Sequence, residues 1–299
     1  MKIINFGSLN IDYVYKVKEI VSPGETTAAL SREVFSGGKG LNQSVALGRA
    51  GAAVSHAGLI GDETGDLLNV LEASGVETNL IRSCPTQTGH AVIQVDGNGQ
   101  NSIIVLGGAN RQITKDMLAE MFSGFDKSDM LLLQNETSCT REAIEQAFEK
   151  GMTICFNPSP FTEELKNYPI DKISWLILNS TEGTQMSGEQ EPGEIVRSLS
   201  AKYPGLKIVL TLGSKGAICF DGESECFQSS FKVKAADTTG AGDTFTGYFL
   251  ASVAAGKALP EALRTASAAA ALAVTVKGAA ASIPGLSDVE DFLYSQRDM

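Results

Sequence analysis

Short apolar runs alternate with segments of helical periodicity along most of this 299-residue chain. Runs such as "MLLLQ" (130–134), "WLILN" (175–179) and "KIVLT" (207–211) consist mainly of apolar residues, and the segments between them repeat apolar residues at helical spacing. Strands that are apolar on both sides must be covered on both faces, which is typical of parallel strands connected by helices. The pattern therefore predicts an α/β fold, a three-layer sandwich around a mostly parallel central sheet.

Two segments, 13–35 and 87–106, break this alternation because they contain strand-like stretches with no helix between them. In the second segment, two β-rich runs flank the turn sequence Asp96-Gly97-Asn98-Gly99, which indicates a hairpin. This hairpin is either a simple edge hairpin of the main sheet or part of a small second sheet that covers a site. We expect the second arrangement, with a β-sheet lid over 13–35 and 87–106 and a catalytic core formed by 1–12, 36–86 and 107–299.

Charge and composition exclude several classes of protein. The net charge is −11 and no Lys/Arg cluster is longer than a pair, so no nucleic-acid partner is expected. The start "MKIINFGS" lacks the features of a signal peptide, and the most apolar stretch, 266–276, is too short to cross a bilayer. Five cysteines without a C-x-x-C spacing suit a reducing compartment. We expect a cytoplasmic protein with no membrane partner.

The stretch "DTTGAGDTFTGYF" (237–249) places glycines where a loop becomes a helix. The preceding "FKVKAAD" (231–237) is strand-like, and the following residues have helical periodicity. Free backbone N–H groups and the positive end of the helix dipole meet at such a helix start, which makes it an anion site. Asp243 is either the N-cap of this helix or a reacting group, and the stretch alone does not decide between the two.

Other motifs that would explain a glycine loop are absent. The Gly-Lys pair at 38–39 is followed by glycine instead of Ser or Thr, so it is not a Walker A loop. Phe245 stands where a dinucleotide fingerprint needs its third glycine, which weakens a nicotinamide oxidoreductase. The two histidines, His56 and His90, lie in strand-like segments, and there is no G-x-S-x-G elbow. A hydrolase and a zinc site are therefore disfavoured.

A second glycine cluster, "FSGGKGLNQS" (35–44), also precedes a predicted helix. Lys39 and Asn42 are placed to project from this turn. The cluster is either a hinge of the lid or a loop that hydrogen-bonds a polyhydroxylated ligand, whose hydroxyls need both donors and acceptors. Further polar residues follow the apolar strands, where α/β folds build their sites. These residues are Asn10, Asp12, Glu136, Asn179, Glu182 and the segment 211–214.

The two glycine boxes, "GGKGLNQ" (37–43) and "DTTGAGDTF" (237–245), occur together and in this order. With "NSTE" (179–182), "TLGSKG" (211–216) and "AVTVKGAAAS" (273–282), they make the chain similar to the ribokinase/PfkB family of sugar kinases over nearly its whole length. The resemblance implies an α/β core with a β-sheet lid, and ATP with Mg²⁺ and K⁺ as cofactors. It also implies phosphoryl transfer to the primary 5-hydroxyl of D-ribose.

The same resemblance implies roles for individual residues. Asp243 would accept the proton of the sugar hydroxyl, and Gly240, Ala241 and Gly242 would form the anion hole for the γ-phosphate. The sugar would be held by Asn10, Asp12, Gly38, Lys39, Asn42 and Glu136. The residues facing ATP would be Asn179, Thr211, Gly213, Ser214, Gly216, Gly242 and Ser267. Ser267 replaces a histidine that some relatives place near the adenine. Glu182 would act indirectly on Mg²⁺, and the K⁺ loop would comprise Asp237, Thr239, Ala273, Val276, Gly278 and Ser282.

Besides the weakened nicotinamide oxidoreductase, two alternatives remain open on the sequence. The chain could be a related kinase for deoxyribose, a fructose-type sugar or a nucleoside, although its polar candidate residues suit a small free sugar. It could also be a catalytically silent sugar-binding protein on the same fold.

Because the exposed edges of such lid sheets are often covered by a partner, we expect a homodimer formed through the lid segments 13–35 and 87–106.

Overall fold

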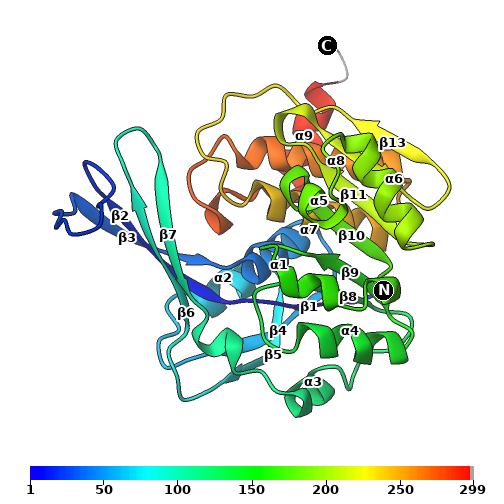
Figure 1. Ribbon diagram of the computed structural model, residues 1–299, viewed down its shortest axis with the longest axis horizontal. Helices are drawn as coiled ribbons and strands as arrows, with labels where there is room; N and C mark the ends of the chain where they lie inside the picture. Colours follow the sequence, from blue (N-terminus) through cyan, green and yellow to red (C-terminus); the bar gives the residue numbers. More distant parts are fainter. Residues whose placement is uncertain (297–299) are drawn as a thin grey trace.

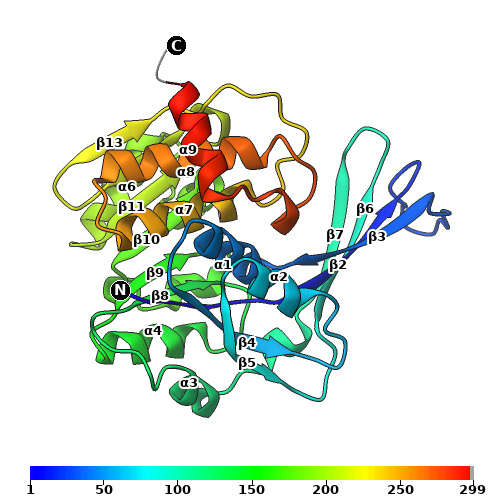
Figure 2. The same ribbon diagram turned by 180° about the vertical axis from the view of Figure 1, so that it is seen from behind.

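The computed structural model describes residues 1–296, and within that range the central sheet has nine strands in the order β13-β12-β11-β10-β9-β8-β1-β4-β5 (Figures 1 and 2). All neighbours from β5 to β11 pair in parallel, and β12 and β13 are antiparallel. The predicted mostly parallel sheet is confirmed. The strands are β1 (Ile3–Phe6), β4 (Val54–Ile60), β5 (Glu77–Ser83), β8 (Met130–Gln134), β9 (Thr153–Asn157), β10 (Trp175–Asn179), β11 (Lys207–Thr211), β12 (Ala217–Phe220) and β13 (Glu225–Gln228).

Helices cover both faces of this sheet, as the doubly apolar strands require. Leu132 of β8 belongs to a core cluster that includes residues of α1, α2, α7, α8 and α9, whereas its neighbours Leu131 and Leu133 belong to a second cluster that includes residues of α3, α4 and α6. The predicted three-layer sandwich is thus confirmed (Figure 1). The helices are α1 (Lys39–Arg49), α2 (Leu67–Ala73), α3 (Lys115–Met121), α4 (Thr140–Glu149), α5 (Ser180–Ser187), α6 (Pro192–Lys202), α7 (Ala241–Ala254), α8 (Leu259–Ala273) and α9 (Leu286–Ser295).

A separate four-stranded sheet extends from one side of the core (Figures 1 and 2). Its order is β3-β2-β6-β7, and the predicted hairpin corresponds to the antiparallel pair β6–β7. The hairpin belongs to this second sheet and not to the edge of the main sheet, so the edge-hairpin interpretation is wrong. We call these four strands the lid: β2 (Asn10–Lys16), β3 (Ser31–Gly37), β6 (Gly89–Val95) and β7 (Asn101–Leu106).

The lid strands begin close to the core. β2 starts at Asn10 and β3 ends at Gly37, so Asn10 and Asp12 lie on a lid strand, although the sequence placed 1–12 with the core. The predicted core reached residue 299, and residues 297–299 lie outside the described residues. No helix among residues 1–296 is long and apolar enough to cross a membrane.

One predicted element is wrong. The strand-like "FKVKAAD" (231–237) is irregular and joins neither sheet. Its end is attached instead to the carboxyl end of α8, where the backbone N–H groups of Ala236 and Asp237 donate to the carbonyl of Val274 at 2.7 and 3.1 Å. Alternating apolar residues indicated a strand, but a strand also needs a neighbour, which the local sequence does not specify.

Candidate active site

Asp243 lies at the start of α7, where the sequence left its role undecided. The N-cap is Gly240, whose φ of 75° is in the left-handed region that glycine adopts without strain. Asp243 is the third residue of the helix and makes no capping hydrogen bond, so the N-cap interpretation is wrong. Its carboxylate is directed at α1 instead, and only 6% of the residue is exposed.

One face of α1 supplies the hydrogen-bond and ion-pair partners of this carboxylate among the described residues. Asn42 Nδ2 donates to Asp243 Oδ2 at 3.1 Å, and Gln43 Nε2 donates to Oδ1 at 2.9 Å. Lys39 Nζ lies 3.9 Å from Oδ1. Positions i, i+3 and i+4 share one face of a helix, so the spacing within "KGLNQ" brings all three side chains to one acceptor. α7 can approach this face closely because Gly247, one turn after Asp243, has no side chain. A Cβ there would lie 2.4 Å from the Cβ of Ala46.

Lys39 lies among three carboxylates that the sequence assigned to different parts of the site. Asp243 raises the pKa of Lys39, burial opposes the effect, and Glu136 and Glu182 raise the pKa further. Glu136 Oε2 also accepts a hydrogen bond from the Lys39 backbone N at 3.0 Å and one from Ser8 Oγ. Glu182, which is expected to act on magnesium, and the residues expected to bind sugar therefore influence the same cation.

The lid contributes Asn10 and Asp12 to this region. Asn10 Oδ1 accepts a hydrogen bond from Asn110 Nδ2 at 2.8 Å, which leaves the Asn10 amide N–H groups to donate. Burial and the nearby carboxylate of Glu136 raise the pKa of Asp12 to about 7. Gly37 faces Asp12, and a Cβ on Gly37 would lie 2.0 Å from Asp12 Oδ2. The first glycine of the box therefore makes room for a carboxylate.

Asn42 Oδ1 is buried and has no hydrogen-bond partner within the described chain. A buried carbonyl oxygen without a partner is costly, and a hydroxyl group of a ligand can satisfy it. Gly38 is the N-cap of α1 with a φ of 94°, which turns the chain from the lid into this helix. The arrangement of Asn10, Asp12, Asn42 and Glu136 thus offers donors and acceptors in the mixture that a polyhydroxylated ligand needs.

The N-terminus of α7 has the properties of an anion site. Gly240, Ala241 and Gly242 form its first turn with Asp243, and the first N–H groups of a helix have no acceptor within it. Gly242 is exposed, and a Cβ built on it would meet no atom of the chain within 4 Å. Space beside Gly242 is therefore open to a ligand, next to the Asp243 carboxylate.

The predicted nucleotide segment begins with a capping box. Asn179 Oδ1 accepts from Glu182 N at 2.9 Å, and Glu182 Oε2 accepts from Asn179 N at 3.0 Å. The "NSTE" pattern thus starts α5, a helix that the sequence reading missed. Ser267 is 7% exposed within α8 and offers little surface to a ligand. Of the other predicted ATP residues, Thr211 ends β11, and Gly213, Ser214 and Gly216 belong to the turn that follows this strand.

The predicted cation loop joins two distant segments at Asp237. Asp237 Oδ2 accepts from Gly278 N at 3.0 Å, and Oδ1 accepts from Thr239 N at 3.0 Å and Thr239 Oγ1 at 2.7 Å. Burial would raise the pKa of Asp237, but these hydrogen bonds hold the pKa below its usual value. The Ala273 carbonyl accepts from Val276 N at 3.1 Å, and Ser282 Oγ donates to the Ala279 carbonyl at 2.8 Å.

Sequence reasoning missed the buried amides behind Asp243. Gln43, Gln134, Asn157 and Asn5 form hydrogen bonds with one another or with Asp243, and each is at most 8% exposed. Three of them occupy apolar strands, in "KIINFG", "MLLLQ" and "MTICFN". A polar amide within a buried strand was the signal that could have identified them.

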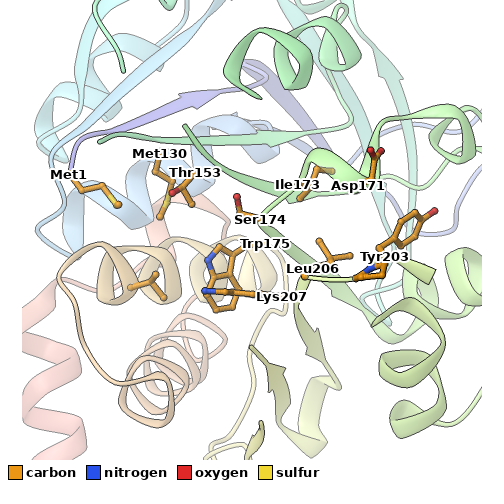
Figure 3. A pocket seen from close by; sticks show the side chains of 13 residues that line it. Met1, Met130, Thr153, Asp171, Ile173, Ser174, Trp175, Tyr203, Leu206 and Lys207 are labelled. Carbon is orange, nitrogen blue, oxygen red and sulfur yellow. The ribbon is translucent and has the colours of Figure 1, made fainter. Parts of the chain in front are cut away.

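A cavity of about 510 Å³ lies away from this site (Figure 3). Met130, Thr153, Trp175 and Lys207, which begin β8, β9, β10 and β11, line it together with Met1. It therefore occupies the amino edge of the parallel sheet, whereas Asn179 and Thr211 end their strands at the carboxyl edge. None of the predicted site residues lines it.

The sequence matches the family described as "pfkB family carbohydrate kinase" over residues 1–286. A ribokinase of Haemophilus influenzae is 35% identical over 297 residues, covering 96% of each chain. A deoxyribokinase of Salmonella typhi is 30% identical over 304 residues, covering 98% of this chain and 99% of the relative. The solved structure of Arabidopsis thaliana ribokinase complexed with ribose and ATP aligns with a TM-score of 0.86 at 31% identity, covering 98% of both chains.

Proposed function

This chain belongs to the PfkB family of carbohydrate kinases, and on that premise we propose that it phosphorylates D-ribose at the 5-hydroxyl with ATP. One observation carries the proposal: the Asp243 carboxylate lies between the open helix N-terminus at Gly242 and the polar groups of Asn42 and Lys39. A hydroxyl bound there can meet a base and a phosphoryl group at one point. The ribokinase relatives support ribose as the acceptor.

In the proposed reaction the sugar 5-oxygen attacks the γ-phosphorus of ATP. The bond from that phosphorus to the bridging oxygen of ADP breaks, and the hydroxyl proton passes to Asp243. Phosphoryl transfer depends mainly on positioning and on stabilising the charge of the transferring oxygens. We propose that the N–H group of Gly242 at the α7 N-terminus stabilises that charge, together with the N–H group of Ala241, which donates to the Thr238 carbonyl at 3.3 Å in this structure. Asn10, Asp12, Asn42 and Glu136 would hold the sugar.

The residues present also fit the metal ions that we propose. Mg²⁺ is commonly held by one or two carboxylates together with substrate phosphates, and Glu182 is the carboxylate on the nucleotide side. It is 6% exposed, and one of its oxygens is held by the Asn179 N–H, so it would act on the ion indirectly. When bound, the ion would neutralise charge on the phosphates.

K⁺ suits the loop around Asp237, because a hard monovalent cation prefers oxygen ligands. The loop offers the Asp237 carboxylate and backbone carbonyl groups, including those of residues 273, 276 and 278. Among the described residues no group of three or more His, Cys, Asp or Glu side chains could hold a metal ion, so carbonyl oxygens would have to provide most ligands.

We expect the turnover rate to be several-fold higher in K⁺ than in Na⁺ or in tetramethylammonium at equal ionic strength. The cation would lie beside the first turn of α7 and add positive potential where the phosphoryl group binds. A coupled assay of ADP release in the three chlorides measures the effect. Equal rates in all three would remove the cation loop from the proposal.

The substrate is tested by comparing kcat/KM for ribose, 2-deoxyribose, fructose and adenosine. We expect ribose to be preferred, with phosphorylation at the 5-position identified by ³¹P NMR of the product. A preference for deoxyribose would favour the activity named for the Salmonella relative. Ribose binding detected by calorimetry without any ADP release would indicate a silent sugar-binding protein instead.

We propose that the lid joins two copies of the chain, because its apolar surface is open. Ile103, Ile104 and Val105 on the edge strand β7 are 52%, 67% and 59% exposed. Unpaired, apolar edge strands favour pairing with another chain. We expect light scattering to give a dimer mass for the wild type and a monomer mass for Ile104→Lys. Phe227→Lys, at a site on β13 that is 58% exposed, should remain a dimer. A monomeric wild type at micromolar concentration would refute the proposal.

The five cysteines are all free, consistent with the reducing cytoplasm in which we propose that the enzyme acts. Fractionation of cells that produce the tagged protein tests this placement, and recovery in a secreted fraction would contradict it.

A further inference from the structure

We propose that Gln43 is a positioning residue that orients the Asp243 carboxylate for the reaction. The inference rests on the proposed role of Asp243 and extends it to a side chain that cannot contact substrate, because Gln43 is fully buried. Its Nε2 donates to Asp243 Oδ1 at 2.9 Å and to Asn157 Oδ1 at 3.0 Å. Its Oε1 accepts from Gln134 Nε2 at 2.7 Å. Both N–H groups and the carbonyl of Gln43 are therefore engaged.

Backbone carbonyl groups determine which way each side-chain amide of this hydrogen-bonded row points. Asn157 Nδ2 donates to the Ile177 carbonyl of β10 at 2.8 Å, so its Oδ1 must face Gln43. Gln43 in turn must direct its Nε2 at Asn157 and Asp243, since a flipped amide would oppose oxygen to oxygen. Because the carbonyl oxygen of Ile177 can only accept, Asn157 must donate to it, and Gln43 must then donate to both Asn157 and Asp243.

The orientations of Gln134 and Asn5, at the other end of this row of amides, are fixed in the same manner. Gln134 Nε2 donates to Asn5 Oδ1 at 2.9 Å as well as to Gln43. Asn5 Nδ2 donates to the Gly40 carbonyl at 2.8 Å and to Ser44 Oγ at 2.8 Å. The amides thus tie Asp243 of α7 to strands β1, β8 and β9 of the central sheet. Among the amide groups of this network only Gln134 Oε1 has no partner within the described residues. Hydrogen-bonded polar networks in the interior hold their members in place.

These hydrogen bonds restrict the rotation of the Asp243 carboxylate. Asn42 holds Oδ2 and Gln43 holds Oδ1, so the plane of the carboxylate is set from two sides. Asn42 also has an unpartnered oxygen available to a ligand, whereas Gln43 does not. Removing Gln43 should leave sugar binding in place and let the base rotate away from the hydroxyl. A misplacement of about 1 Å can lower a rate on the order of 10²-fold.

The test compares Gln43→Met, Gln134→Met and Gln146→Met by steady-state kinetics. Methionine keeps the side-chain length and removes the amide. We expect Gln43→Met to lower kcat roughly 10- to 100-fold with little change in KM for the sugar. Gln134→Met, one link further away, should lower kcat less. Gln146→Met, on α4 and outside the chain of amides, should behave as the wild type.

A pH profile separates positioning from a general loss of structure. An N–H group donated to a carboxylate favours its charged form, so its loss should move the acid limb of the kcat profile to higher pH. Lys39 beside Asp243, the carboxylates of Glu136 and Glu182 that act on Lys39, and Asp12 are the other titratable groups of the site, and all are unchanged in the three variants. A structural role alone would leave this limb in place.

Three results would overturn the inference: an unchanged kcat in Gln43→Met, a rise in KM alone, or an acid limb that does not move. If Gln43→Met does not fold, Gln134→Met decides by the same kcat and KM readouts, because the direct contact to Asp243 remains in it. The acceptor sugar found in the substrate comparison is used throughout. A different preferred sugar would therefore revise the proposed function without affecting this test.

Discussion

Replacing Asp243 by asparagine is expected to lower kcat for ribose phosphorylation roughly 10²–10⁴-fold, the usual effect of losing a general base. The amide has nearly the same shape as the carboxylate, so the packing of α7 against α1 should be retained. The base is lost because an amide oxygen cannot take the hydroxyl proton. A coupled assay of ADP release with saturating ribose and ATP measures kcat, and thermal unfolding confirms that the variant is folded.

Asp288→Asn is the matched control, because Asp288 is likewise the third residue of its helix, α9. Its carboxylate accepts a hydrogen bond from Gly285 N at 3.0 Å and lies outside the candidate site. We expect this variant to turn over at the wild-type rate. An Asp243→Asn enzyme that did the same would exclude Asp243 as the base.

Gly242→Ala is expected to lower kcat/KM for ATP on the order of 10²-fold without destabilising the protein. No atom of the chain lies within 4 Å of a Cβ at this position, so the folded protein can accept the methyl group. Alanine also favours a helix over glycine by about 1 kcal/mol, and the free energy of unfolding should therefore not fall. The methyl group would occupy the space in which a phosphoryl oxygen meets the helix N-terminus, and the loss of one such donor typically has an effect of about this size.

Gly247→Ala, on the same helix, is expected to destabilise the protein, in contrast to Gly242→Ala. Its Cβ would lie 2.4 Å from the Cβ of Ala46, so α7 and α1 must move apart. Overpacking of this kind costs about 1–3 kcal/mol. Urea unfolding should show a loss of stability for Gly247→Ala and none for Gly242→Ala. Full activity in Gly242→Ala would mean that no phosphoryl group approaches this turn.

The parts of the fold that the sequence predicted are those governed by local periodicity. Apolar strands such as 130–134 and 207–211 are covered on both faces because their side chains alternate between them, and this follows from composition and spacing alone. The turn at 96–99 likewise specified a hairpin. The strand predicted at 231–237 was wrong because the pattern that indicated it was local, whereas strand pairing depends on a distant partner.

The candidate site was predicted from two glycine boxes, and the structure explains their residues one by one. Gly37 leaves room for Asp12, Gly38 takes a positive φ, and Gly40 allows close packing, since its Cβ would be 2.3 Å from Ser8 N. Of these three glycines only Gly37 makes room for a residue, Asp12, that we propose to bind the sugar. A glycine in a motif signals that a side chain is excluded, but the neighbour that excludes it is known only from the fold.

The sequence by itself determined the sheet with helices on both faces, the family, and the spacing of Lys39, Asn42 and Gln43 along one helical face. These properties depend on residues that are close in the chain. Only the tertiary structure decided that this face meets Asp243, and that Asn157 and Gln134 hold Gln43 between them. The physical reason is that an amide can donate or accept in either direction. Its orientation is set by the partners that folding brings to it, and here they come from strands about one hundred residues away.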